Sequence, residues 1–289
     1  MGTIESGRTR GARVRAVITA AAAATCALLG GGLGCVSPEA ASGVVAADAS
    51  VIAPDRATAD APVFVIEAAP QDDAVAAVLE ADLRAGRALI EAFFGLPFRD
   101  DVAVTIAPDR AAFTAAFPPE WGMTETACWM VATGVADFMV ILSPRVWGTE
   151  ACEHDATDAR HVRDIVVHEL VHVFHGQHNP TRDFTGAEEI GWFAEGLAVH
   201  VSGQLHRGRL AEPREAVELG LGPERLADAW SGRYRYGVSG SLVAFFESRV
   251  GREGLRQMLA VTNQEDLLAI LKLDEQQCLA QWREYVLAR

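Results

Sequence analysis

The sequence predicts an α+β fold, in which a small sheet from the first part of the folded region supports a mainly helical second half. Short segments with strand-like composition occur between residues 63 and 142. Segments with helical periodicity dominate from Ala159 onward. No internal repeat and no long low-complexity tract interrupts residues 63–289, so we expect a single domain there.

The first predicted elements are a strand and a long helix. Residues 63–67 alternate and are rich enough in β-branched side chains for a short strand. Residues 72–94 place their apolar side chains near one side, which predicts a helix, and Gly95 and Pro97 end it. The folded region is therefore expected to begin with a strand followed by a helix.

Two further strands and a series of helices follow. Val102, Val104 and Ile106 alternate as a second strand, and Asp109 is placed to cap a short helix after it. Residues 138–142 are apolar throughout, which predicts a central strand. The later helices are expected at residues 164–176, 188–203, 237–250, 254–261 and 276–287.

Residues 1–35 have the layout of a secretory signal peptide, with four arginines, then an apolar run and then small residues. They end in Gly32-Leu33-Gly34-Cys35, which resembles a bacterial lipobox except that Gly32 stands where leucine is preferred. Residues 36–62 are rich in Ala, Ser, Asp and Pro and predict a flexible tether. We therefore expect export to the cell envelope as a lipoprotein anchored through Cys35, or otherwise a periplasmic or secreted protein.

The remaining cysteines agree with an oxidising compartment. Assigning Cys26 to the signal peptide and Cys35 to lipid leaves three cysteines. Cys128 and Cys152 flank a predicted strand and are expected to form a disulfide. Cys278 lies on an apolar helix face and is expected to be a buried free thiol.

The charge balance argues against a nucleic-acid partner. The formal net charge is −14, and none of the 25 basic residues forms a run of the kind that follows a phosphate backbone. We expect a monomer whose only membrane contact is the N-terminal lipid anchor.

The motif that carries chemistry is His168-Glu169-Leu170-Val171-His172, an HExxH sequence. Residues four apart on a helix lie about 40° from eclipsed, so both imidazoles can reach one ion. The glutamate beside them can then address a water bound to that ion. The sequence therefore predicts a zinc site with His168 and His172 as ligands.

A catalytic zinc site needs a third protein ligand and one open position for water. Glu195 is the only acidic residue in an apolar stretch from Ile190 to Val201. Burying an unpaired carboxylate is costly, and coordination to a dication removes that cost. Glu195 is the expected third ligand.

These two segments together are similar to the gluzincin group of zinc metallopeptidases, the thermolysin-like or peptidase MA-like enzymes. The resemblance implies a zincin-like catalytic domain over residues 63–289, with His168, His172 and Glu195 as zinc ligands and Glu169 as general base for hydrolysis of a peptide or protein. Tyr236, at the start of a later helix, would stabilise the oxyanion, with Tyr234 as the alternative.

The sequence departs from the thermolysin pattern beside the third ligand. Val199 stands where thermolysin has an aspartate that orients a histidine, so the outer partner of the histidines is unassigned and Asp164 is one candidate. His175 is expected to line the cleft without binding metal, and His200 is expected to be an ordinary packing or surface histidine.

Two alternatives stay open. His178 has the spacing of the third ligand in metzincins, although Gly176 stands one place later than that motif requires. A noncatalytic zinc-binding envelope lipoprotein with a zincin fold would carry the same residues, since a fold does not establish an activity.

Overall fold

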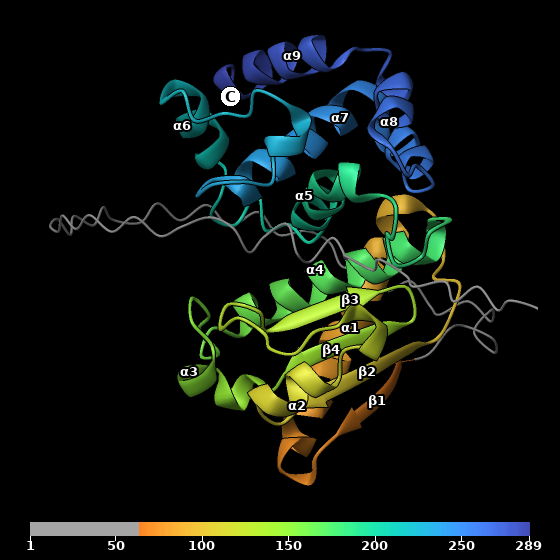
Figure 1. Ribbon diagram of the computed structural model, residues 1–289, viewed down its shortest axis with the longest axis vertical. Helices are drawn as coiled ribbons and strands as arrows, with labels where there is room; N and C mark the ends of the chain where they lie inside the picture. Colours follow the sequence, from red (N-terminus) through yellow and green to blue (C-terminus); the bar gives the residue numbers. More distant parts are fainter. Residues whose placement is uncertain (1–63) are drawn as a thin grey trace, which may run out of the picture.

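The computed structural model describes residues 64–289, and its sheet comes entirely from the first part of that range (Figure 1). Strands β1 (Phe64–Ala68), β2 (Val102–Ala107) and β4 (Phe138–Leu142) run parallel, and β3 (Ala132–Val135) pairs antiparallel with β4. The strand order is β1-β2-β4-β3. The three predicted strands are confirmed, and β4 lies inside the sheet as expected. The edge strand β3 was not predicted.

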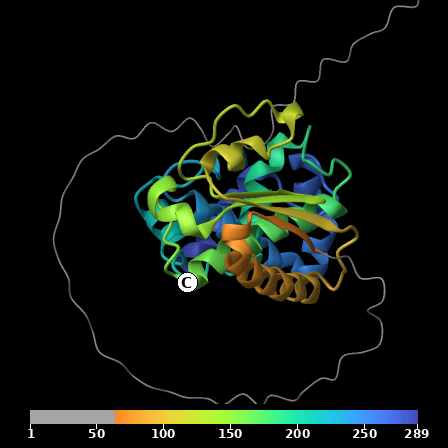
Figure 2. The same cartoon turned by 90° about the horizontal axis from the view of Figure 1, so that it is seen from below.

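Helices cover both faces of this sheet. Helices α1 (Asp73–Phe94) and α4 (Ala159–His178) pack against each other on one face, and α2 (Arg110–Ala115) lies on the other (Figure 2). Asp109 caps α2, because its side chain accepts a hydrogen bond from the Ala112 backbone N–H at 2.8 Å. A short helix, α3 (Trp147–Glu150), follows β4.

The second half is helical, and the α+β expectation is confirmed. Its elements are α5 (Gly191–Val201), α6 (Glu212–Glu218), α7 (Arg235–Met258), α8 (Gln264–Leu271) and α9 (Glu275–Leu287). The sequence did not predict α6 or α8. It predicted two helices where α7 is one element with a local break at Gly251, whose φ of 65° is left-handed.

Helix α5 lies between α4 and α7 and so connects the two halves (Figure 1). Gly196 allows its close approach to α7, because a Cβ atom there would lie 2.4 Å from the Ser239 carbonyl oxygen. Nearly all of α5 is buried. A polar side chain on α5 is therefore held firmly in position.

The expected disulfide is present. Cys128 and Cys152 are bonded, with their Cα atoms 5.2 Å apart, and Cys278 on α9 is a buried free cysteine, as predicted. The bond joins the two ends of the segment that contains β3 and β4. It therefore ties this sheet edge to the loop that leads into α4.

We expect that replacing both bonded cysteines with alanine lowers the free energy of unfolding by roughly 3 kcal/mol, because the bond closes a loop with a sequence separation of 24. Urea unfolding of the wild type and of Cys128→Ala/Cys152→Ala measures the loss. Reductant should destabilise the wild type and leave the double variant unchanged. Equal stability of the two proteins would contradict this role.

The predicted signal peptide at residues 1–35, with Cys35, and the predicted tether at residues 36–62 lie outside the described residues. Within residues 64–289, no helix is both long enough and apolar enough to cross a membrane.

Candidate metal centre

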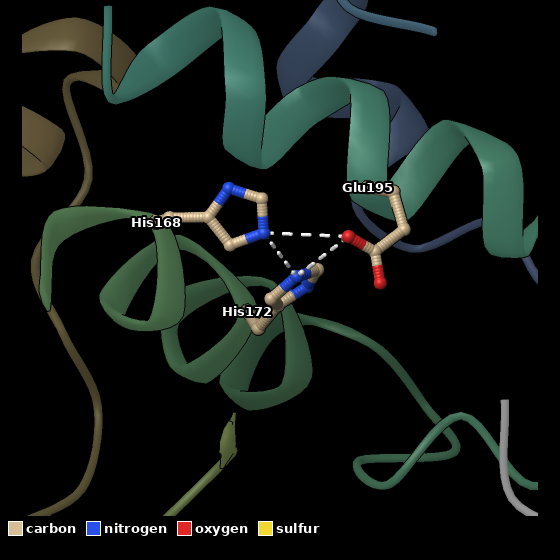
Figure 3. Close-up of side chains that lie close together, drawn as sticks. All are labelled: His168, His172 and Glu195. Atoms are coloured by element: carbon tan, nitrogen blue, oxygen red, sulfur yellow. Dashed lines mark hydrogen bonds and ion pairs between the residues drawn. The ribbon is translucent and has the colours of Figure 1, made fainter. Parts of the chain in front are cut away.

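Three side chains converge where α4 and α5 face each other. His168 and His172 project from α4, and Glu195 projects from α5 toward them (Figure 3). The two Nε2 atoms are 3.2 Å apart, and Glu195 Oε2 lies 3.3 Å from His168 Nε2 and 3.6 Å from His172 Nε2. These distances are close to the ~3.4 Å expected between ligands of one tetrahedral ion with ~2.1 Å bonds. The group can hold a metal ion.

Local sequence explains why these side chains meet. Asp158 caps α4 by accepting hydrogen bonds from the Arg160 and His161 backbone N–H groups at 2.9 and 3.3 Å, and the helix then continues through the motif. The spacing of four residues brings both histidines to the side of α4 that faces α5. Glu195 is the only acidic residue on the otherwise buried α5.

The electrostatics favour a charged carboxylate at Glu195. Burial by itself would raise the pKa of this group, but the adjacent His172 and His168 side chains lower it by more. The net pKa lies well below the usual range for glutamate. Glu195 is therefore an anionic oxygen donor beside two imidazole nitrogens, a ligand set that suits a borderline divalent cation.

Gln204 is the outer partner of His168. Its Oε1 atom lies 3.1 Å from His168 Nδ1, and its Nε2 atom donates to the Asp164 carbonyl oxygen at 3.3 Å. Because Oε1 is an acceptor, Nδ1 carries the proton and Nε2 has its lone pair free for a metal. The Asp164 carboxylate is instead paired with Arg207, at 2.7 Å from its Nε. The Asp164 side chain, one candidate for the outer partner, is therefore not the group that contacts His168.

We expect Gln204→Ala to weaken metal affinity by roughly 10- to 100-fold, the usual effect of losing such an outer hydrogen bond. Competition with a chromogenic chelator measures the change, and Gln257→Ala, at an exposed position on α7, is the matched control. Unchanged affinity in Gln204→Ala would show that His168 is oriented by helix packing alone.

Glu169 lies in the cleft next to the three ligands. Burial raises its pKa to about 7, while His168 and the Gly134 backbone N–H act in the opposite direction. Gly134 lies in β3, and a Cβ atom there would be 2.9 Å from the Glu169 carbonyl oxygen. The absence of a side chain at this position lets the sheet edge approach α4 and form one wall of the cleft.

Aromatic side chains form much of the rest of the cleft. Its large apolar and aromatic residues are Trp121, Trp129, Met130, Phe184, Trp230 and Tyr236. Tyr236 packs edge-on against Trp230, with ring centroids 4.7 Å apart. Burial raises the pKa of Tyr236, and the Glu195 carboxylate raises it further, so the phenol keeps its proton. Tyr236 is therefore a hydrogen-bond donor beside the candidate metal centre.

The alternative tyrosine lies elsewhere. The Tyr234 hydroxyl contacts Arg233 and donates to Glu215 Oε2 at 3.2 Å, and Tyr234 lines a separate pocket. Of the two tyrosines, only Tyr236 lines the cleft.

The other histidines singled out in the sequence do not join the three ligands. His178 Nε2 lies 3.0 Å from the Pro97 carbonyl oxygen, and the described residues that can hold a metal are His168, His172 and Glu195. The arrangement thus gives no support to a metzincin-like ligand set.

Two histidines are packing residues. His175 is completely buried between Phe184 and Phe193, and burial lowers its pKa to about 3. It does not line the cleft, contrary to expectation, because it lies beneath the cleft surface. His200 pairs with Glu247 at 2.6 Å, which agrees with the packing role expected for it.

Comparisons with protein families, with curated proteins and with solved structures found no match to this chain.

Proposed function

We propose that this protein is a zinc-dependent peptidase of the gluzincin type with a zincin-like domain. The observation that carries the proposal is the convergence of His168, His172 and Glu195 in a cleft that also contains Glu169. Three protein ligands leave one position free, as in catalytic zinc sites, whereas structural zinc sites take four ligands from the protein.

In the proposed reaction, the metal, Glu169 and Tyr236 have separate roles. A bound Zn²⁺ would act as a Lewis acid toward water and the scissile carbonyl. The Glu169 carboxylate takes a proton from the attacking water and later delivers it to the leaving amine nitrogen. The Tyr236 hydroxyl donates a hydrogen bond to the oxygen of the former carbonyl as negative charge develops there. The aromatic walls hold the substrate and limit access of bulk water.

The proposal is tested by metal analysis and peptide hydrolysis with the purified protein. We expect one zinc per chain and cleavage of casein or of a quenched-fluorescence peptide library. Zinc without turnover on a broad peptide panel would favour the noncatalytic binding protein, and absence of zinc after purification and reconstitution would contradict the ligand assignment.

We also propose that the enzyme acts in the cell envelope, held there by lipid on Cys35. We expect Cys35→Ser to move the protein from the membrane fraction to the soluble envelope fraction, with Cys26→Ser as the control in the same segment. Membrane retention of Cys35→Ser would contradict a lipid anchor at this residue.

A further inference from the structure

Arg235 is a cationic group in the cleft that has no acidic partner. It is the first residue of α7 and lines the same cleft as His168, Glu169 and Glu195. None of the acidic side chains that the structure describes forms an ion pair with Arg235, and its Nε atom is buried without a hydrogen-bond partner. A guanidinium partly removed from water without a counter-charge is costly to the free protein.

By contrast, two other arginines in this region each form an ion pair with an acidic side chain. Arg209 stacks over the Tyr236 ring at 4.3 Å and pairs with Glu212 Oε1 at 3.0 Å. Arg207 pairs with Asp164. Arg209 and Arg207 thus have acidic partners within the protein, whereas Arg235 has none among the described side chains.

The surroundings of Arg235 hold it toward the candidate reaction site. Its Cζ atom lies 5.0 Å from the Tyr236 ring centroid and 5.8 Å from that of Trp230. Arg235 also lowers the pKa of Tyr236, against the larger effect of burial, so the guanidinium is electrostatically coupled to that hydroxyl. A substrate group bound by Arg235 would therefore lie beside the scissile peptide bond, on which Tyr236 and Glu169 are proposed to act.

Among the described residues that line the cleft, Asp183 is the one acidic side chain besides Glu169 and Glu195. Its Oδ1 atom accepts a hydrogen bond from the Thr185 backbone N–H at 3.0 Å, and it forms no ion pair with Arg235. The counter-charge that Arg235 lacks is thus not supplied by the described part of the chain.

We propose that Arg235 binds a carboxylate of the substrate and so makes the cleft selective for acidic peptides. The inference rests on the proposed peptidase function and specifies its substrate class. Arginine forms paired, charge-assisted hydrogen bonds with carboxylates. A substrate carboxylate would therefore give Arg235 the acidic partner that the described part of the chain does not provide. The carboxylate is either the C-terminus of a short peptide or an acidic side chain next to the scissile bond.

Binding to an inactive protein separates this question from turnover. Zinc-loaded full-length Glu169→Gln would be titrated calorimetrically with two matched pairs of peptides. One pair is benzoyl-Gly-Phe and its C-terminal amide, which tests the terminal carboxylate. The other is benzoyl-Gly-Glu-amide and benzoyl-Gly-Gln-amide, which tests an acidic side chain. The titrations are repeated with Arg235→Met, Arg235→Lys and Arg233→Met in the same background.

We expect the acidic member of one pair to bind about tenfold more tightly or better than its neutral counterpart, and that pair identifies the source of the carboxylate. Arg235→Met should abolish the preference, and Arg235→Lys should retain part of it. Arg233→Met should leave it unchanged, because Arg233 contacts Tyr234 in the other pocket. Unaltered thermal unfolding of the variants confirms that they are folded.

Equal binding of acid and neutral peptides, or a preference that survives Arg235→Met, would overturn the inference. So would a failure of all four peptides to bind the zinc-loaded protein. Each of these results is distinct from failure of the proposed function, which would appear as a wild-type protein that lacks zinc or hydrolyses no peptide.

Discussion

Glu169→Gln is expected to bind zinc as the wild type does and to lose about 10³-fold in peptide hydrolysis. General bases contribute roughly 10²- to 10⁴-fold to catalysis, and the amide cannot accept the proton of the attacking water. The side chain lies in the cleft beside the ligands without belonging to the set that can hold the metal. Its loss should therefore affect kcat and leave the metal stoichiometry at one.

Initial rates on a quenched-fluorescence peptide and zinc analysis by mass spectrometry measure the two quantities on one sample. Glu189→Gln is the matched control, because Glu189 is exposed in the turn before α5. Its substitution should change neither the hydrolysis rate nor the zinc content. Activity close to that of the wild type in Glu169→Gln would refute the assignment of the base. Loss of both zinc and activity would show that Glu169 supports the metal instead.

Glu195→Ala is expected to weaken zinc binding by at least about 100-fold, which exceeds the effect of losing an outer hydrogen bond. Among the described residues that can hold the metal, the substitution removes the carboxylate and leaves two imidazoles on one helix. Chelator competition gives the affinity of wild type and variant. Glu188→Ala, at an exposed position before α5, controls for loss of a glutamate in this region.

The same variant should lose most of the stabilisation that zinc gives to the folded protein. A ligand present at about 1,000 times its Kd stabilises by ~4 kcal/mol, which is roughly 10 °C in Tm for a domain of this size. Chelation should therefore lower the wild-type Tm by about that amount and the Glu195→Ala Tm by about a third of it or less, because 100-fold weaker binding leaves only ~1.4 kcal/mol of stabilisation. Full zinc retention in Glu195→Ala would contradict its role as a ligand and point to another donor.

The sequence predicted the parts of the fold that depend on local pattern. Alternating Val102, Val104 and Ile106 indicated β2, and the Asp109 cap of α2 is a short-range interaction. Strand β3 was missed because it has only four residues, one of which is Gly134. Such a short segment does not show a recognisable alternation of apolar and polar side chains. Its strand conformation depends on pairing with β4 and on the close approach to α4.

The sequence by itself determined the chemical identity of the candidate site. The spacing of His168 and His172 requires only helix periodicity, and the isolated acidic Glu195 on an apolar helix indicated a partner for its charge. That these three groups approach within the separations of a common ion depended on the packing of α5 against α4.

The tertiary structure alone decided the surroundings of that site. Gln204 and Arg235 are far from the motif in sequence, and neither lies in a recognisable pattern of its own. His175 continues the histidine face of α4 but is enclosed by Phe184 and Phe193. Contacts between segments that are distant in the sequence decide which polar groups reach the cleft and which of them lack a partner. These contacts cannot be predicted from the local sequence.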